Sequence, residues 1–389
     1  MFRKSVYSIC FILVLGLVMT NITNAADPNL VGWWKFDGNA NDASGNGLNG
    51  TTFGEPNYVA GPTYGDDLSF YPDDIAINLE GLTTATDPAN PYVELPSEVG
   101  SIISSLTDCS FTIWVNFRTI GGTYKWTPIF DFGTSTSNHM FLCPRRSSSP
   151  PTHFEINVGG SAQRVSWGPY STAGTTIPAY AWAHVAVTID DANDIFRLYV
   201  DGEQVGETTG TGATFAPIDL GVTTMNYLGK PMVVGQHYYV GYLDDFRIYN
   251  RTLSVAGVQQ AMGYPIATFP TPADGAVFPA DTTTANLTWI KGNNAAAVNG
   301  SHLYLSDDLD AVSNGDAAAD KGLLSDSSYT ATDLVQDVIY YWRIDTVATN
   351  GTVYQGDIWN FRLQPRVAWI PTPSDKTLRN FGERRKDYR

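Results

Sequence analysis

The chain has 389 residues, of which 43% are hydrophobic and 13% aromatic, so it can build packed cores and is not a disordered protein. Its formal net charge of −16 argues against nucleic acids and anionic membrane surfaces as partners. Helical periodicity is nearly absent, and short apolar runs alternate with Gly, Pro, Asn and Asp, which predicts an all-β protein.

The first 26 residues resemble a secretory signal peptide. Arg3 and Lys4 precede the apolar run ICFILVLGLVM, and small residues around Ala25 offer a cleavage site. An uncleaved anchor helix is the alternative, although the run is short for a membrane span. We expect a mature chain that is secreted, periplasmic or on the cell surface, without membrane insertion.

Short predicted strands follow one another from residue 27 to residue 262. They include LVGWWKF, SFTIWVNF, AHVAVTID, IFRLYV and GYLDDFRIY. Asp201 and Gly202, between RLYV and EQVG, predict a type I′ hairpin turn. LSVAGVQQAM predicts a short helix capped by Ser254. Many short strands with regular turn signals favour a jelly-roll sandwich.

A proline-rich segment separates a second unit, residues 266–363, which has the length of a seven-strand sandwich. Within VIYYWRIDTV, alternate residues from Tyr340 share one face, and Asn350-Gly351 predicts a hairpin after it. Pro-Thr-Pro at 270–272 recurs at 371–373. The basic tail, residues 364–389, therefore either begins an interrupted repeat or shares its composition with the linker by chance.

The run NDASGNGLNG, residues 41–50, has three readings. Its glycines spell G-x-G-x-x-G, but no helix-forming segment follows, so we expect no dinucleotide site. Asp42, Ser44 and Asn46 begin like an EF-hand loop, yet Phe53 stands where that loop needs its glutamate. What remains is an oxygen-rich turn, which either holds a hard cation or is metal-free.

LVGWWKFDGNANDASGNGLNG resembles the opening of laminin-G-like (concanavalin A-like jelly-roll) domains. SFTIWVNF, WAHVAVTID, RLYVDGEQV and VGYLDDFRIYNRTLS follow in that family's order. The resemblance covers nearly the whole first unit and implies a concanavalin A-like sandwich. It also implies a structural Ca²⁺ shared between the Gly-rich turn and the acid opening the last strand. The implied ligands are Asp42, Asn46 and Asp244, with Asp37 and Asp245 as weaker candidates.

YYWRIDTV and GDIWNF make the second unit resemble a fibronectin type III-like module. In that family, a tyrosine near the start of the sixth strand is a packing residue, so the resemblance implies a structural role for Tyr340. The second unit would act as a spacer.

Three cysteines are present, and Cys10 leaves with the predicted signal peptide. Cys109 and Cys143 remain as an even pair in an oxidising compartment, which favours a single disulfide. Two independently buried thiols are the alternative.

Catalytic motifs are missing from the sequence. Related jelly-roll glucanases use E-x-D-x-x-E on one strand, whereas Glu155 has no acidic residue two positions away. The five histidines lack metal-ligand spacing, and no G-x-S-x-G occurs. We therefore expect a protein that is not an enzyme.

The expected function is recognition of an extracellular glycan, or of a surface protein, by the Ca²⁺-stabilised jelly roll. Sugar-binding surfaces combine aromatic rings with a few polar groups, and loop-like aromatics are the candidates. They are Trp126, Trp167, Tyr170 and Tyr238, each of which could instead pack in a core. The alternatives are a structural component of a surface assembly and the binding fragment of a larger polysaccharide-degrading hydrolase.

Overall fold

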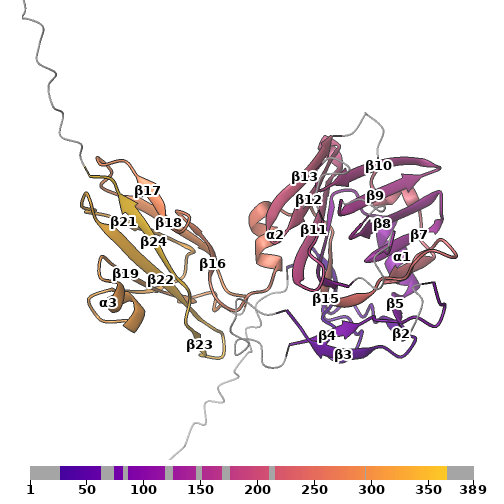
Figure 1. Ribbon diagram of the computed structural model, residues 1–389, viewed down its shortest axis with the longest axis horizontal. Helices are drawn as coiled ribbons and strands as arrows, with labels where there is room; N and C mark the ends of the chain where they lie inside the picture. The colour runs from indigo at the N-terminus through magenta and orange to yellow at the C-terminus, as the bar shows by residue number, and fades with distance from the viewer. Residues whose placement is uncertain are drawn as a thin grey trace, which may run out of the picture.

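The computed structural model describes residues 27–62, 74–81, 86–118, 126–145, 151–168, 176–209, 215–293 and 295–365. Strands make up 45% and helices 9% of the described residues, so the all-β prediction is confirmed. The chain forms a larger N-terminal body and a smaller C-terminal body, with helix α2 (Val255–Ala261) between them (Figure 1). The predicted signal peptide and residues 366–389 lie outside the described residues.

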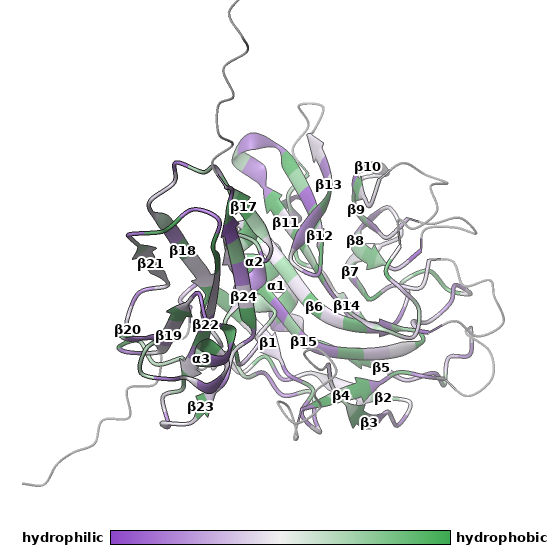
Figure 2. Cartoon of the chain, turned by 60° about the vertical axis from the view of Figure 1, so that its left-hand side comes forward, coloured by the Kyte–Doolittle hydropathy of each residue, from purple (hydrophilic) through white to green (hydrophobic). Residues whose placement is uncertain are grey.

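The larger body is a sandwich of two antiparallel sheets. The first sheet has the order β13-β12-β11-β6-β15-β4-β3, and β1 also pairs with β15. Its strands are β1 (Leu30–Trp34), β3 (Asn57–Ala60), β4 (Ile75–Asn78), β6 (Cys109–Phe117), β11 (Trp182–Asp190), β12 (Ile195–Val200), β13 (Glu203–Thr209) and β15 (Gly241–Tyr249). Figure 2 shows hydrophilic residues along the edge strand β13, where charge protects an open edge from pairing.

The second sheet has the order β10-β9-β8-β7-β14-β5-β2. Its strands are β2 (Thr51–Phe53), β5 (Tyr92–Glu94), β7 (Phe130–Ser135), β8 (Asn138–Cys143), β9 (His153–Val158), β10 (Ser161–Ser166) and β14 (Met225–Leu228). Helix α1 (Ser97–Ile103) follows β5, and short 3₁₀ turns occur at Asp191–Asn193 and Pro217–Leu220.

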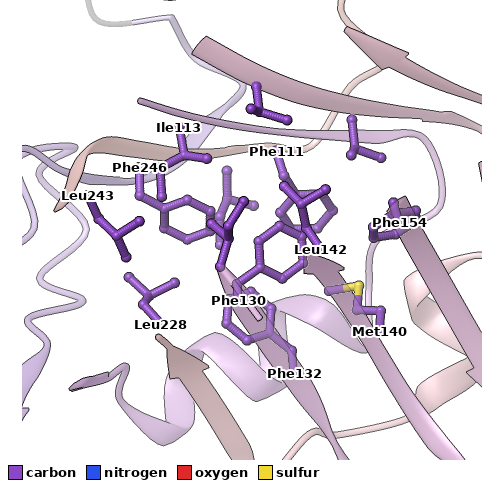
Figure 3. Packing of buried hydrophobic residues seen from close by; sticks show 14 of the residues in the cluster. Phe111, Ile113, Phe130, Phe132, Met140, Leu142, Phe154, Leu228, Leu243 and Phe246 are labelled. Carbon is purple, nitrogen blue, oxygen red and sulfur yellow. The ribbon is translucent and has the colours of Figure 1, made fainter. Parts of the chain in front are cut away.

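Aromatic side chains from the two sheets meet in the core. Phe111 on β6 lies 5.4 Å from Phe130 on β7, measured between ring centroids, and Phe130 lies 5.8 Å from Phe246 on β15 (Figure 3). Each of these rings is at most 1% exposed. Full burial of such a side chain stabilises the fold by roughly 1.5–3 kcal/mol. These contacts clamp the two sheets face to face.

Strand β15 changes its neighbour halfway along. Its first half pairs with β4 and its second half with β1, while β6 pairs with both halves. The register with β6 shifts between Asp244 and Arg247, and Asp245 has a φ of 52°. This is a β-bulge, which bends a strand and re-aims its side chains. It places two adjacent acids where the neighbouring strand changes.

The smaller body is also a two-sheet sandwich. One sheet is β16 (Thr268–Thr271), β18 (Ala285–Ile290) and β21 (Ser328–Ala331). The other has the order β17 (Ala276–Phe278), β24 (Ile358–Leu363), β22 (Ile339–Val347), β19 (Ser301–Ser306) and β20 (Asp320–Leu324), with β23 (Val353–Tyr354) paired to β22. Helix α3 (Leu309–Asn314) contacts β19 and β22. The fibronectin III-like identity of this body stays a prediction.

Tyr340 makes the contacts of a packing residue. Its ring stacks on Phe361 at 5.5 Å, and its hydroxyl oxygen accepts a hydrogen bond from the Val335 N–H at 2.8 Å. Two other residues of the same strand face, Trp342 and Ile344, are fully buried in the core of this body.

Elements with local signals appear where the sequence predicts them. The Ser254 side chain accepts a hydrogen bond from the Gly257 N–H at the start of α2. Asp201 and Gly202 have φ values of 50° and 79°, as the hairpin between β12 and β13 requires. Helices α1 and α3 were not predicted, because each has only six or seven residues and shows little periodicity.

The segment that joins the two bodies is docked onto them. The Trp114 indole N–H donates to the Met262 carbonyl at 3.0 Å, and the Trp114 ring packs edge-on against Tyr264 at 5.8 Å. From the smaller body, the Asn293 N–H donates to the Tyr264 carbonyl at 2.7 Å. The joint is therefore packed rather than free in solvent. Within the part of the chain described, no helix is long and apolar enough to cross a bilayer.

The predicted disulfide does not form. Cys109 begins β6 in the first sheet and Cys143 ends β8 in the second, and no disulfide joins these two buried residues. Burial raises the pKa of the Cys109 thiol well above its ordinary value, and the charges of Asp108 and Asp191 act in the same direction. The alternative of two buried thiols holds.

Both thiols should therefore be reactive only after unfolding. We expect Ellman's reagent to modify Cys109 and Cys143 in denatured, unreduced protein and neither residue in folded protein, because both are fully buried. A reducing agent should leave the melting temperature unchanged. Thiols that appear only after reduction would contradict the structure.

Candidate functional site

The outer face of the second sheet carries a pocket of about 190 Å³. On strand β8, Met140 and Leu142 belong to the core, so the alternate residues His139 and Phe141 point the other way. The pocket is lined by outward residues of β7, β8 and β9 together with neighbouring loops: Trp126, Pro128, Asp131, Thr136, His139, Phe141, Glu155, Asn157, Pro231, Val233 and Gln236.

Strand register sets several of these side chains in one row. Asp131 on β7 is opposite Phe141 on β8, and Phe141 is opposite Glu155 on β9. Glu155 in turn is opposite Arg164 on β10. Directly opposed residues have Cβ atoms about 4.5–5.5 Å apart, so neighbouring members of the row can touch. The row contains three charged groups and one aromatic ring.

The acid Asp131 is held by two donors. Its Oδ1 lies 2.8 Å from His139 Nδ1, and its Oδ2 accepts a hydrogen bond from the Met232 N–H at 2.8 Å. The His139 ring also stacks on Phe141, with centroids 5.2 Å apart. Asp131 is 3% exposed, so this network keeps a buried carboxylate hydrogen-bonded.

Glu155 is held by a histidine and an arginine. Its Oε2 lies 3.2 Å from His153 Nε2 and accepts a hydrogen bond from Arg164 Nε at 2.5 Å. Burial acts to raise the pKa of Glu155, but the hydrogen bonds from His153 and Arg164 outweigh burial and lower it to about 2. The carboxylate is therefore ionised near neutral pH and can only accept hydrogen bonds.

Trp126 forms one wall of the pocket in an uncommon backbone conformation. Its φ is 57°, a left-handed value that bulky residues adopt rarely. Its ring packs edge-on against Phe141 at 5.9 Å and against His153 at 6.2 Å, and its N–H donates to the Arg145 carbonyl. Such conformations persist where the surroundings enforce them, and they cluster at functional sites.

Two other predicted aromatics, Trp167 and Tyr238, do not line this pocket. Trp167 is half-buried and packs against the core of the larger body. Tyr238 is 8% exposed, and its ring lies 6.1 Å from that of Tyr92. Tyr170 lies outside the described residues. Of the three that the structure describes, only Trp126 lines the pocket.

A second aromatic cluster continues the same sheet face. Tyr227 on β14 is directly opposite Asp131 of the pocket, and Tyr227 packs edge-on against Tyr92 at 5.7 Å. Phe53 stacks on the other side of Tyr92, with ring centroids 4.7 Å apart. The Lys230 ammonium lies 4.1 Å from the centre of the Tyr92 ring and 4.2 Å from that of Tyr227.

One chain of hydrogen bonds has the composition of a hydrolase triad. Ser166 Oγ lies 2.8 Å from His153 Nδ1, and the other ring nitrogen faces Glu155. The His153 ring is fully buried, however, and Glu155 already forms an ion pair with Arg164. The three residues come from adjacent strands, where the chain of bonds fixes the orientation of the ring.

The predicted calcium ligands Asp42 and Asn46 are hydrogen-bonded within their own turn and to strand β1. The Asp42 carboxylate accepts hydrogen bonds from the N–H groups of Trp33, Ser44 and Leu48 at 2.9–3.1 Å. Burial acts to raise the pKa of Asp42, but these backbone hydrogen bonds lower it. Asn46 is exposed and donates through Nδ2 to the Val31 carbonyl. Asp42 therefore organises the Gly-rich turn.

Asp244 instead faces Asp74, a residue that sequence reasoning missed. A Cβ atom on Gly61 would lie 2.7 Å from Asp74 Oδ2 and 3.2 Å from Asp244 Oδ2, so both oxygens flank one spot. Burial, followed by the charges of Asp245, Asp74 and Asp37, raises the pKa of Asp244 well above its ordinary value. Burial, followed by Asp245 and Asp37, raises the pKa of Asp74 to about 7.

The neighbouring acid Asp245 has its own partners. The Trp33 indole N–H donates to its Oδ1, and Arg247 Nη2 lies 2.8 Å from its Oδ2. Asp74 and Asp245 line a cavity of about 180 Å³ at the junction, to which the smaller body contributes Tyr354. Among the described residues, no group of three or more His, Cys, Asp or Glu side chains lies together as a metal site.

Residues 87–259 match the family profile described as the concanavalin A-like lectin/glucanases superfamily, Laminin_G_3. This part of the chain is therefore similar to domains of that superfamily, and it lies inside the predicted range 27–262. No curated protein matches the chain.

The chain is also similar to several solved structures. Domain 4 of AbnA, an extracellular GH43 arabinanase of Geobacillus stearothermophilus solved with arabinotriose, shares 19% identity over 60% of this chain and 98% of that chain, with a TM-score of 0.43. The CBM40 of Ruminococcus gnavus IT-sialidase, solved with α2,3-sialyllactose, shares 14% identity over 48% of this chain and 96% of that chain, with a TM-score of 0.37. The binding domain of botulinum neurotoxin DC, solved with rat synaptotagmin II, shares 10% identity over 87% of this chain and 79% of that chain, with a TM-score of 0.42.

The lowered pKa of Glu155 predicts a specific acid sensitivity. Because the folded pKa of about 2 lies below the ordinary value of 4.5, ionised Glu155 stabilises the fold at neutral pH. That contribution is lost as the pH falls from about 4.5 to about 2. In urea titrations across this range, the original protein should lose more stability than Glu155→Gln does. Equal losses of stability in the original protein and in Glu155→Gln would contradict the lowered pKa of Glu155.

Proposed function

We propose that the protein is an exported, non-catalytic binding protein that recognises an extracellular glycan through the outer face of the second sheet. The observation that carries the proposal is a pocket in which Trp126 and Phe141 stand beside the buried acids Asp131 and Glu155. Aromatic rings pack against the apolar faces of sugars, and carboxylates accept hydrogen bonds from sugar hydroxyls. The superfamily match over residues 87–259 supports the proposal.

The charges of the pocket favour binding over hydrolysis. Glycoside hydrolysis needs one carboxyl group kept protonated at the working pH. The pKa of Glu155 is instead lowered to about 2, and His139 and Met232 engage both oxygens of Asp131. Neither acid is arranged to deliver a proton. Turnover of a polysaccharide by the purified protein would overturn this part of the proposal.

We also propose that Ca²⁺ stabilises the junction and that Asp74 and Asp244 supply its carboxylates. Their oxygens flank the spot that a Cβ on Gly61 would fill. Burial, and after it the charges of neighbouring acids, raises their pKa values, and a divalent cation would offset both effects. Ca²⁺ accepts backbone carbonyls and water as further ligands. The ion would supply charge neutralisation and structural support, with no part in recognition.

The glycan proposal predicts that Trp126→Ala weakens binding. Loss of one ring from the pocket should lower affinity by about 10- to 100-fold, because aromatic anchors dominate such contacts. Glycan-array screening followed by calorimetry on a positive hit measures the effect.

The matched control is Tyr180→Ala. Tyr180 is 57% exposed and lies over Arg118, which follows the first-sheet strand β6, so its removal should leave glycan affinity unchanged. No retention of any glycan across a broad array would refute the proposal and favour a surface-assembly role.

The calcium proposal predicts that Asp74→Asn raises the melting temperature without Ca²⁺ and removes the increase that Ca²⁺ causes. The folded pKa of Asp74, about 7, lies above its ordinary 3.8, so its ionisation costs stability as the pH rises through this range. In chelator at pH 8, Asp74→Asn should therefore melt higher than the original protein. Added Ca²⁺ should raise the melting temperature of the original protein but not that of Asp74→Asn or Asp244→Asn.

Asp42→Asn separates the two possible ligand sets. Because the Asp42 carboxylate is used within its turn, this variant should melt lower yet keep its response to calcium. Equal melting of the original protein with and without Ca²⁺ would remove the site. If Asp42→Asn loses the rise in melting temperature caused by Ca²⁺ and Asp74→Asn keeps it, the calcium site lies at the Gly-rich turn instead.

A further inference from the structure

We infer that the outer face of the second sheet binds a neutral glycan chain several sugar rings long, which lies across the strands. The inference rests on the proposed function and adds the length and charge of the ligand. It follows from the continuity of the aromatic rings along this face and from the charges that lie between them.

The aromatic rings extend well beyond the pocket. From Glu155 on β9 the face crosses β8, β7, β14 and β5 to Phe53 on β2. Five strand intervals span roughly 24 Å at the usual separation of strands. This distance is greater than one sugar ring, so a single ring in the pocket at Trp126 would leave most of the face unused.

Pocket and aromatic cluster are joined at two places. Tyr227 is directly opposite Asp131, which lines the pocket. The loop after β14 also borders both, because Pro231 lines the pocket while the adjacent Lys230 covers the Tyr92 ring. At the far end, Phe53 is 39% exposed. The two regions therefore form one continuous surface.

The charges on this surface disfavour anionic sugars. Asp131 and Glu155 are buried in the pocket, and the charge of Glu94 acts on Tyr227. Among the described residues, the cations Arg164 and Lys230 already have partners, since Arg164 pairs with Glu155 and Lys230 lies over two tyrosine rings. A uronate or sulfate would lie beside carboxylates of the same sign, in a chain whose net charge is −16. Neutral hydroxyls, in contrast, can donate to those carboxylates.

The test is calorimetry with a defined panel of oligosaccharides. The neutral probes are the dimers and hexamers of the cello-, xylo-, manno- and arabino- series. The anionic probes are hexagalacturonate and dextran sulfate, with unsulfated dextran as the matched neutral polymer. We expect one neutral hexamer to bind about tenfold or more tightly than its own dimer. Its affinity should not change between low and high salt, since no ion pair is formed.

Two variants separate the ends of the surface. Phe53→Ala should weaken hexamer binding by roughly tenfold, the effect of one lost ring contact, and leave dimer binding unchanged. Trp126→Ala should weaken both ligands. Phe53 is exposed at a sheet edge, so this variant should keep its fold, which far-UV circular dichroism and the melting temperature check. Trp126→Phe keeps a ring in the pocket and should restore much of the dimer affinity.

The outcomes distinguish the inference from the proposed function. Tightest binding to hexagalacturonate or dextran sulfate would overturn the inference and leave glycan recognition standing. Equal affinity for dimer and hexamer, or equal loss for both in Phe53→Ala, would overturn the extended surface. No binding to any glycan of the panel or of the broad array would remove the proposed function, and the inference with it.

Discussion

A buried arginine, Arg247, ties together the parts of the molecule that meet beside β15. Its guanidinium donates to Asp245 Oδ2 at 2.8 Å and to the Ala261 carbonyl at 3.0 Å, and it lies over the Trp33 ring at 4.6 Å. A buried charge is tolerated only when it is paired, and loss of one partner costs about 3–5 kcal/mol. The bulge in β15, the first strand and the end of α2 therefore depend on one another.

This arrangement decides which face of the sandwich is available. On the first sheet, Ala186 and Tyr199 pack against Leu253 and Val258 from α2 and the turn before it. His184 on the same face is 1% exposed, and burial, with Arg247, lowers its pKa to about 3, so it packs as a neutral ring. The joint thus covers part of the first sheet, which is why the proposed ligand lies on the outer face of the second sheet.

Sequence reasoning predicted what local chemistry controls. The Asp201-Gly202 hairpin and the Ser254 cap depend on residues a few positions apart, and both appear in the structure. The all-β class followed from strand periodicity. The Gly-rich turn was correctly identified as dense in oxygen atoms. The Asp42 carboxylate, however, accepts hydrogen bonds from nearby backbone N–H groups, a pattern that composition does not reveal.

The remaining features depend on which strands are neighbours. Glu155 meets Arg164 only because β9 pairs with β10, and Asp74 meets Asp244 only because β4 pairs with β15. Cysteine parity similarly says nothing about Cys109 and Cys143 lying in different sheets. Strand order is a long-range property, so a single sequence showed the candidate residue types but not their partners.

The docked joint has a consequence for how the protein would work in a larger assembly. The backbone carbonyls of Met262 and Tyr264 are bonded by Trp114 from one body and Asn293 from the other. A flexible tether lets two modules search independently, with an effective concentration set by its length. Here the packed joint would make the second module a rigid spacer. Any structure attached to the second module would be held in one orientation and at one distance relative to the larger body.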